Sequence, residues 1–443
     1  MYKGRRVLVI GLGISGQSAV KFLMKRGALV VGTDSNQNIA TTNENIRTLC
    51  QQGMVFESES NIGDVSRFDL VVVSPGIPQT NPCYRQAKEK GLEIVGEIEL
   101  ACREINKTCL AVTGTNGKTT VTLLTEHVLQ KSGKRAKALG NIGIPLTSGV
   151  DELSKEQLDI FVIELSSFQL ETLNSRFIDA GVILNITPDH LDRYPTIYEY
   201  AAAKVKMKDN IKENGELFVE DKCYIEYFSL FKNHLVKTYG YDTKCFLYTD
   251  TYDVNSQSGK AFTLPAAYHG KHSHDIENII ASYALCSTVG ISAEQFIDAL
   301  SSFKKPAHRI EFVRMLNDVS YIDDSKGTNI DAVIRAVDSI DGSVVLIAGG
   351  VDKGFPYTPW IQAFGPKVKS ICAIGQSKEK IKNDLGHHIP TELFTTLHEA
   401  VIHAASIAKK GDTVLLSPGC SSYDMFTDYA HRGKEFQRIT NAL

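Results

Sequence analysis

Residues 112–120 read VTGTNGKTT, after the apolar run TCLA and before a segment of helix length. Glycines at a strand-to-helix turn let backbone N–H groups and the helix N-terminus face an anion, and the following lysine adds charge for terminal phosphates. The strict pattern G-x-x-x-x-G-K-[ST] is not met, because Val112 stands at its first glycine position. A structural glycine turn is the alternative. We predict a nucleoside-triphosphate site formed by Gly114, Thr115, Asn116, Gly117, Lys118, Thr119, Thr120 and Val121.

Metal-binding residues are expected close to this loop. Lys118 would contact the β- and γ-phosphates, and the hydroxyl of Thr119 would coordinate Mg²⁺. Further oxygen ligands come from the carboxyl ends of neighbouring parallel strands. Glu164 ends the apolar run IFVIE and suits that role, although such a glutamate alone is more often a surface or capping residue. His190, after the next apolar run, could bind a second ion or cap its turn.

The fold class follows from the alternation of short Val/Ile-rich runs with amphipathic segments along the 443 residues. This pattern is typical of parallel sheets covered by helices, so we predict an α/β protein. The length exceeds what one core normally holds. We expect three domains at 1–97, 98–303 and 304–443, with Rossmann-like first and third domains around a central P-loop ATPase-type domain. Residues 214–272 are polar and tyrosine-rich, and the pattern there predicts no clear structure.

Composition excludes several classes of function. The net charge is -3, from 48 basic and 51 acidic residues without a basic stripe, so nucleic acid is not an expected partner. No run approaches the roughly 18 apolar residues that span a bilayer, so no membrane insertion is expected. Nine cysteines without a C-x-x-C pair indicate a reducing compartment, the cytoplasm. Cys109 and Cys372 are interpreted as small buried hydrophobes.

A second glycine motif, GLGISG at 11–16, lies near the N-terminus, and Asp34 ends the next apolar run. On physical grounds these two features suggest a dinucleotide fold with Asp34 on a ribose. A nicotinamide-dependent dehydrogenase, or a nucleotide-binding regulator, is therefore a competing hypothesis. This hypothesis leaves GTNGKTT unexplained. Comparing the binding of NADH with that of UDP would separate it from the interpretation based on GTNGKTT.

Four motifs taken together closely resemble the Mur ligases, the ATP-dependent amino-acid ligases of bacterial peptidoglycan synthesis. They are GTNGKTT, ELSSFQLE (164–171), NITPDHLDRYP (185–195) and YAAAK (200–204). The resemblance extends from residue 5 to about 438, and the flanking motifs look like those of the members that add D-glutamate. It implies ATP and two Mg²⁺ ions as cofactors. It also implies that a monomer activates UDP-N-acetylmuramoyl-L-alanine as an acyl phosphate, which D-glutamate attacks.

The resemblance also assigns roles at the nucleotide. Lys118 would grip ATP, Glu164 and His190 would hold the magnesium ions, and Lys204 would be carbamylated to supply a further ligand. Without the YAAAK match, Lys204 would be interpreted as a solvated helix lysine. The remaining contacts implied are Asn278 to adenine, Arg309 to the phosphates, Asp324 to the ribose, and Lys326 to ATP or substrate. The family usually has His-Asn where this chain has His274-Asp275, so no role is carried over to Asp275.

Substrate residues follow in the same way. The resemblance places the UDP-sugar against GLGISG and SPGIP (74–78), with Ser15, Asp34, Ser74, Gly76 and Asn141 as its contacts. It assigns D-glutamate to Thr328, Lys353, Ser422 and Tyr429, where the last position is commonly phenylalanine. The sequence DSKGTN at 324–329 resembles the D-glutamate-adding members, whereas relatives that add diaminopimelate or lysine have DYAH-type sequences.

Two further alternatives stay open at this point. A related ligase with another amino acid or acceptor, such as a folylpolyglutamate synthetase, shares the phosphate loop, although the GLGISG segment speaks against it. A nucleotide-gated switch without ligase activity would release ADP without requiring both a UDP-muramoyl substrate and an amino acid.

Overall fold

Three sheets of five, nine and six strands form the framework of the computed structural model, which describes residues 1–152, 158–269 and 273–443. The chain divides into two compact units. The first comprises Met1–Asn185, Ala201–Ala267 and Glu277–Phe303, and the second comprises Ile186–Tyr200, Tyr268–Ile276 and Lys304–Leu443. The predicted α/β class with three sheet-based parts is confirmed, whereas the domain limits at 97/98 and 303/304 stay predictions.

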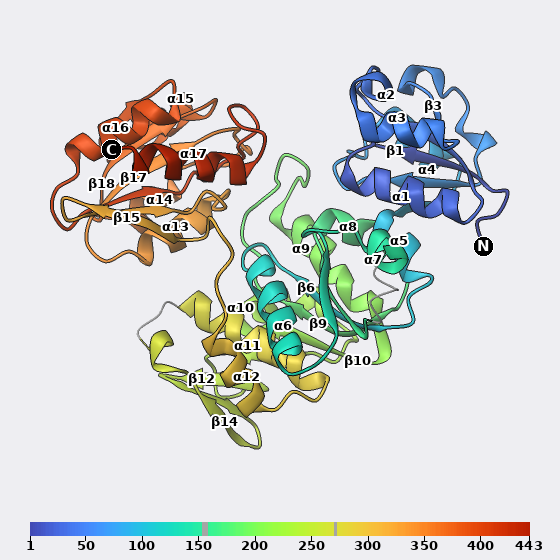
Figure 1. The fold of residues 1–443 in the computed structure, drawn as a ribbon. Coiled ribbons are helices and arrows are strands. Elements are labelled where there is room, and N and C mark those ends of the chain that lie inside the picture. The colour runs from blue at the N-terminus through green and yellow to red at the C-terminus, as the bar shows by residue number, and fades with distance from the viewer. Residues whose placement is uncertain (153–157, 270–272) are drawn as a thin grey trace. The chain divides into compact units, whose positions relative to one another are not determined.

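The N-terminal sheet is fully parallel, with the strand order β3-β2-β1-β4-β5. Alternate residues of β1 enter separate cores: Val7 and Val9 pack toward α1 and α3, and Leu8 and Ile10 pack on the opposite face. Helices therefore cover both faces (Figure 1). The elements are β1 Arg6–Ile10, α1 Ile14–Lys25, β2 Leu29–Thr33, α2 Ile39–Thr42, α3 Glu44–Gln51, β3 Val55–Phe56, the 3-10 turns η1 Glu59–Asn61 and η2 Val65–Arg67, β4 Leu70–Val73, α4 Pro82–Glu89 and β5 Ile94–Gly96.

The central sheet has the strand order β14-β13-β12-β11-β10-β9-β6-β8-β7. It is parallel from β7 to β12 and antiparallel from β12 to β14. Its strands are β6 Thr108–Thr113, β7 Ala136–Gly140, β8 Ile160–Glu164, β9 Ile178–Ile183, β10 Ile211–Glu220, β11 Lys237–Gly240, β12 Leu247–Asp250, β13 Asp253–Ser256 and β14 Gly259–Thr263. Its helices and 3-10 turns are α5 Glu97–Cys102, α6 Lys118–Lys131, α7 Leu146–Glu152, α8 Ser167–Glu171, α9 Ile197–Val205, η4 Lys206–Asn210, α10 Asp221–Glu226, η5 Phe228–Phe231, η6 Ala266–Tyr268, α11 Ser273–Thr288 and α12 Ala293–Ser301.

The segment for which the sequence predicted no clear structure, 214–272, forms most of β10 and all of β11 to β14, and its residues 270–272 lie outside the described part of the chain. Helix α9, just before this segment, ends at Val205. Asn210 closes the following 3-10 turn, because its amide donates to the carbonyl oxygens of Leu173 and Ser175, and β10 then begins. Within the described ranges, no helix is long and apolar enough to cross a membrane.

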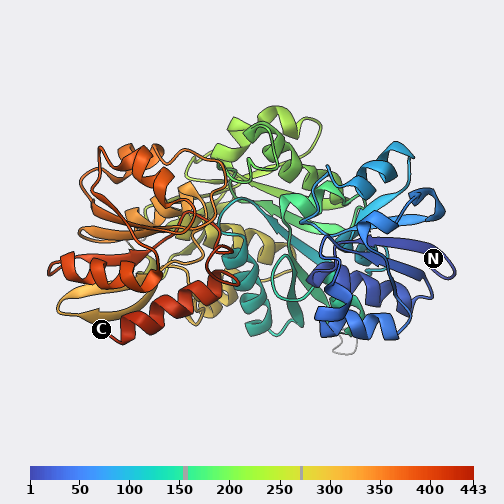
Figure 2. The same ribbon diagram turned by 90° about the horizontal axis from the view of Figure 1, so that it is seen from above.

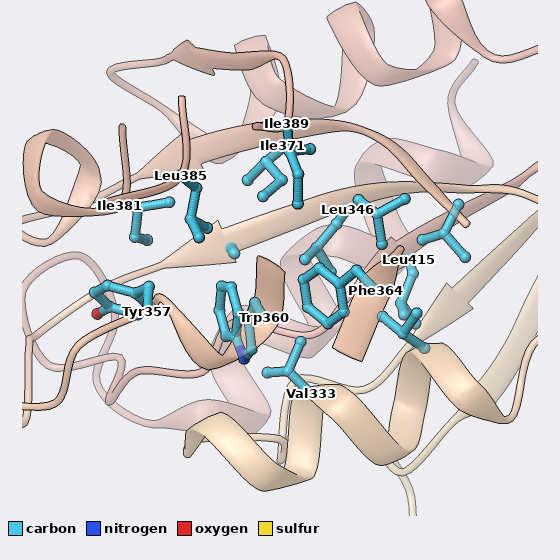
Figure 3. Packing of buried hydrophobic residues seen from close by; sticks show 14 of the residues in the cluster. Val333, Leu346, Tyr357, Trp360, Phe364, Ile371, Ile381, Leu385, Ile389 and Leu415 are labelled. Carbon is cyan, nitrogen blue, oxygen red and sulfur yellow. The ribbon is translucent and has the colours of Figure 1, made fainter. Parts of the chain in front are cut away.

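The C-terminal sheet has the order β15-β16-β20-β17-β18-β19, with only β15 antiparallel to its neighbour. Leu346 and Ala348 of β17 pack with Trp360 of α14 in one core, while Val345 and Ile347 point into a second core beneath α16 and α17. Figure 2 shows helices on both sides of this orange-to-red sheet, and Figure 3 shows Trp360 beside Phe364 and Val333. The elements are β15 Glu311–Leu316, β16 Val319–Asp323, α13 Ile330–Asp338, β17 Val344–Gly349, α14 Pro359–Phe364, β18 Val368–Ile374, α15 Lys378–Leu385, β19 Thr391–Leu393, α16 Leu397–Ile407, β20 Thr413–Leu416 and α17 Tyr429–Asn441.

The cysteines behave as small apolar side chains. All nine are free and eight are buried, with Cys50 half-buried. Cys109 and Cys372 are fully buried, which confirms their interpretation as core residues.

Glu97, the first residue of α5, is a buried carboxyl group in the first unit. Its side chain is 3% exposed, and its Oε1 accepts hydrogen bonds from the backbone N and the hydroxyl of Thr147. Its Oε2 has no hydrogen-bond partner among the described residues. Burial raises the pKa of this carboxyl to about 7.

We expect Glu97→Gln to flatten the pH dependence of stability. The folded protein holds the Glu97 proton up to about pH 7, whereas the unfolded chain releases it near 4.5, so stability falls as pH rises between these values. The full shift corresponds to about 3 kcal/mol. Urea unfolding at pH 5 and pH 8 should show the variant gaining stability mainly at pH 8. The exposed Glu89, changed to Gln, is the control, and equal behaviour of the two variants would contradict this account.

Candidate functional site

The predicted phosphate loop, residues 114–117, joins β6 to α6 in a conformation that glycine permits. Gly114 and Gly117 have φ values of 148° and 90°, which side-chain-bearing residues rarely adopt. A Cβ on Gly117 would collide with Oδ1 of Asn278, which comes from α11. The predicted adenine contact Asn278 therefore lies directly against the predicted phosphate loop.

Asn185, for which no role was predicted from the sequence, holds this loop. Its backbone oxygen accepts from Thr115 N at 2.7 Å, its Oδ1 accepts from Asn116 N at 2.9 Å, and its Nδ2 donates to Asn116 O at 3.0 Å. The only signal was its position as the first residue of NITPDHLDRYP. Asn185 thus fixes the loop through both its main chain and its side chain.

Two lysines converge on one carbonyl oxygen of the loop. Lys118 Nζ donates to Gly114 O and Thr115 O, each at 2.9 Å, and Lys204 Nζ donates to Gly114 O at 2.7 Å. Lys204 is 1% exposed, so it is no solvated helix lysine. Two ammonium groups beside a helix N-terminus favour an anionic ligand.

The other loop residues lie at the start of α6. Thr119 and Thr120 are buried. Val121 is fully buried and its N–H already donates to Gly117 O. A contact between Val121 and the nucleotide stays a prediction, as do the remaining nucleotide contacts.

Glu164 is the last residue of β8, which pairs with β6, and its carboxylate is suited to bind a cation. It is 2% exposed, and its Oε1 accepts from Asn141 Nδ2 at 2.8 Å. Its Oε2 is buried without a hydrogen-bond partner among the described residues. A buried carboxylate oxygen without a donor is costly unless a cation or another donor satisfies it. Magnesium prefers such oxygens, so the residues present fit the predicted ion.

His190 belongs to the second compact unit, in a backbone conformation with φ of 56°. Its N–H donates to Oδ1 of Asp189, and its ring lies 6.1 Å from that of Tyr200. Because Glu164, Lys118 and Lys204 belong to the first unit, a metal site shared with His190 stays a prediction.

We expect Gly117→Ala to weaken ATP binding strongly. The new Cβ would meet Asn278 in a backbone conformation unfavourable to alanine. This strain of about 1–3 kcal/mol corresponds to a rise of about 5- to 150-fold in the KM for ATP. Gly133, just after the same helix, has φ of 80°, but a Cβ at this position would meet nothing within 4 Å. Gly133→Ala should therefore lose some stability and leave the KM for ATP unchanged. An equal effect of both variants on that KM would exclude the collision as the cause.

The five residues predicted for the UDP-sugar line one pocket of about 540 Å³ in the first unit. They are Ser15, Asp34, Ser74, Gly76 and Asn141. The pocket wall is held by hydrogen bonds from Leu12 N to the Asp34 carboxylate at 2.8 Å and from Ser74 Oγ to Gly11 O at 2.7 Å. Because the five residues line the same pocket, they could contact one common ligand. The nature of that ligand stays a prediction.

The residues predicted for the ribose and phosphates in the second unit are linked. Asp324 is 6% exposed, and burial raises its pKa to about 7, while Ser417 Oγ donates to its Oδ2 at 2.7 Å. Ile310 N donates to Asp324 Oδ1, and Lys326 N donates to His308 O. Arg309 therefore sits between two residues that are tied to the Asp324–Lys326 segment.

His308, Glu311 and Asp323 present nitrogen and oxygen atoms within 4.8 Å of one another. His308 Nδ1 lies 2.6 Å from Asp323 Oδ2. The amide of Gln437 lies 2.9 Å from the same oxygen, 3.3 Å from Glu311 Oε2 and 3.5 Å from His308 Nδ1. This amide occupies the position that a cation would need, so the cluster holds the segment around Arg309 in place.

The residues predicted for D-glutamate are spread over several loops of the second unit. Lys326 Nζ lies 3.7 Å from the ring centre of Tyr429, and Ser422 is buried. Lys353 Nζ donates to Asp189 Oδ1 at 3.0 Å, and Asn329 Nδ2 approaches Oδ2 of the same carboxylate at 3.4 Å. Thr328 is half-buried. Asp275, the departure from the family pattern, pairs with Lys305 at 2.8 Å.

Fold and loop together define the class of an α/β nucleotide-binding protein with a phosphate-binding strand-loop-helix unit and Rossmann-like sheets. Three family models match successive parts of the chain: "Mur ligase MurD-like, N-terminal domain" at 5–96, "Mur ligase middle domain" at 112–286, and "Mur ligase, glutamate ligase domain" at 308–420. The chain belongs to the Mur ligase family.

Relatives match over the full length. The chain is 48% identical to UDP-N-acetylmuramoylalanine--D-glutamate ligase of Protochlamydia amoebophila (strain UWE25), covering 100% of this chain and 99% of that protein. It is 36% identical to the protein of the same name from Alkaliphilus metalliredigens (strain QYMF), with the same coverage. Among solved structures, UDP-N-acetylmuramate-alanine ligase from Thermotoga maritima has a TM-score of 0.61 at 17% identity, covering 99% of this chain and 100% of that one. This last similarity concerns the fold alone.

Proposed function

We propose that this chain is an ATP-dependent ligase that joins D-glutamate to the alanine carboxylate of UDP-N-acetylmuramoyl-L-alanine in peptidoglycan biosynthesis. The observation that carries the ATP chemistry is the buried Oε2 of Glu164, which has no hydrogen-bond partner among the described residues. It accompanies a loop on which Lys118 and Lys204 converge. The choice of amine and acceptor rests on the names of the full-length relatives.

At the nucleotide, Lys118 offsets the charge of the β- and γ-phosphates. Thr119, Glu164, His190 and Lys204 would hold two magnesium ions, which would neutralise phosphate charge when bound. An ammonium on Lys204 would repel a cation, and its buried position next to Gly114 suits a carbamate that supplies oxygen ligands instead. Asn278, Arg309, Asp324 and Lys326 complete the ATP site.

The two substrates bind outside the ATP site, at the pocket and the loops described above. The pocket lined by Ser15, Asp34 and Asn141 takes the UDP-sugar, and Thr328, Lys353, Ser422 and Tyr429 take D-glutamate. The alanine carboxylate attacks the γ-phosphate and forms an acyl phosphate and ADP. The amine of D-glutamate then attacks the acyl carbon, and phosphate leaves from a tetrahedral intermediate. Protein groups act mainly by positioning and by neutralising charge.

We further propose that the protein acts as a monomer in the cytoplasm. Its nine cysteines are free, eight of them buried, which suits a reducing compartment.

The test is ADP release with UDP-N-acetylmuramoyl-L-alanine and a panel of amino acids. We expect turnover to require both the UDP-sugar and D-glutamate. Stimulation by another amino acid in place of D-glutamate would indicate a related ligase. ADP release without either substrate would favour a nucleotide-binding regulator.

A further inference from the structure

Arg432 of α17 is a buried cation that the proposed chemistry does not use. Its side chain is 1% exposed. Its Nε donates to Ser325 Oγ at 3.0 Å, Nη2 donates to Ser325 O at 2.9 Å, and both Nη1 and Nη2 lie 3.2 Å from Cys420 O. Throughout the described part of the chain, none of its hydrogen bonds goes to a carboxylate. Burying a guanidinium without a contacting anion is costly, and such groups cluster at functional sites.

The oxygens that Arg432 holds lie on the segments that carry the predicted substrate residues. Ser325 follows Asp324, and its hydroxyl also donates to the backbone oxygen of Tyr429 at 2.8 Å. Cys420 lies two residues before Ser422. One guanidinium thus joins the Asp324–Lys326 segment, the loop before Ser422 and the first residue of α17.

The loop that carries Lys353 also reaches this guanidinium. A Cβ on Gly350 would lie 3.3 Å from Arg432 Nη1, so the backbone of the GGVDKG loop passes beside it. Val351 N donates to Ser421 O at 2.9 Å, which fastens this loop to the one before Ser422. Every segment to which D-glutamate is assigned is therefore attached, directly or through one neighbour, to Arg432.

The charge of Arg432 persists at neutral pH. Burial lowers its pKa to about 10, and Asp424, Asp323 and Asp324 act on it only from longer range. A positive charge in a poorly screened interior attracts an anionic ligand more strongly than a surface arginine does. An amino acid with two carboxylates gains most from it.

We propose that Arg432 is a positioning residue that sets the affinity for the dicarboxylic amino acid, by fastening the loops of Ser422 and Tyr429 and by its buried charge. This inference rests on the proposed function. It assigns Arg432 no contact with the substrate.

The test compares Arg432→Lys and Arg432→Met with wild type in kcat, in KM for D-glutamate, ATP and UDP-N-acetylmuramoyl-L-alanine, and in Tm. We expect the Met variant, which loses charge and hydrogen bonds, to raise the KM for D-glutamate by about 30-fold or more. The Lys variant keeps the charge but not the forked geometry, so it should show about a 5- to 10-fold rise. The KM for the UDP-sugar, whose pocket lies in the first unit, should change less than twofold.

Arg438 on the same helix is the matched control, because it is 64% exposed and pairs only with Glu435 at 2.7 Å in the described structure. Its Lys and Met variants should behave as wild type. A KM for D-glutamate within twofold of wild type in Arg432→Met would overturn the proposal. So would a parallel rise of all three KM values with a lowered Tm, which indicates a structural role alone.

Should Arg432→Met not fold, Arg432→Lys decides by the same comparison of KM values. Wild type is measured first. If wild type does not ligate D-glutamate, the proposed function fails, whereas wild-type ligation with unaffected Arg432 variants rejects only the role of Arg432.

Discussion

Lys118→Ala is expected to abolish ATP-dependent ligation. Lys118 is the first residue of α6, and its ammonium bonds to the carbonyl oxygens of Gly114 and Thr115, within reach of any phosphate in the loop. The Lys118 ammonium offsets the negative charge that moves during phosphoryl transfer. Its loss should lower kcat/KM by on the order of 10³-fold, which is about 4 kcal/mol. ADP release at ATP concentrations well below KM measures the effect, because the rate there is proportional to kcat/KM.

The control for this variant is Lys131→Ala, at the exposed end of the same helix. It should keep full activity. Binding of the UDP-sugar to Lys118→Ala should also be retained, because that pocket is built from other residues. A Lys118→Ala protein with activity within threefold of wild type would refute the nucleotide site at this loop.

Glu164→Gln is the second large expected effect. The substitution keeps the shape and the acceptor for Asn141 Nδ2, but it removes the negative charge from the buried oxygen that has no donor among the described residues. If that oxygen binds magnesium, activity should fall by about 100-fold or more, which is about 2.7 kcal/mol. The magnesium concentration for half-maximal activity should rise.

Stability distinguishes this effect from damage to the fold. Glu164→Gln should not lower the Tm, because a neutral amide costs less to bury than an unpaired carboxylate. The exposed Glu213, changed to Gln in β10, should leave both the activity and the magnesium dependence unchanged. Unaltered magnesium dependence in Glu164→Gln, with activity near wild type, would show that Glu164 is not a ligand.

The predictions from sequence are confirmed where a structural feature depends on a short continuous segment. The apolar run before Gly114 is β6, the glycines of GTNGKTT have positive φ values, and a helix begins at Lys118. The Val/Ile-rich runs RVLVI and VVLIAG form β1 and β17 in agreement with the predicted pattern, since buried parallel strands need unbroken apolar runs. Membership of the Mur ligase family, expected from four motifs, is confirmed by the family models and the full-length relatives.

Sequence reasoning missed residues whose roles depend on distant partners. Asn185 holds Thr115 and Asn116 from 69 or more residues away, and Asp189 meets Lys353 across 164 residues. Arg432, within the polar stretch YAHRGKEF, looks like an ordinary surface residue, and only its burial shows otherwise. No local pattern encodes such pairs.

By itself, the sequence determined the α/β class, the phosphate loop and the family, because strand runs, glycine turns and adjacent motif residues act through local geometry. Only the tertiary structure decided that Lys118 and Lys204 share the oxygen of Gly114 and that one oxygen of Glu164 has no donor among the described residues. It also decided that Arg432 is buried among the loops predicted to bind D-glutamate. These features arise when segments far apart in the chain are packed together and lose their contact with water, and burial then sets which charges must find a partner.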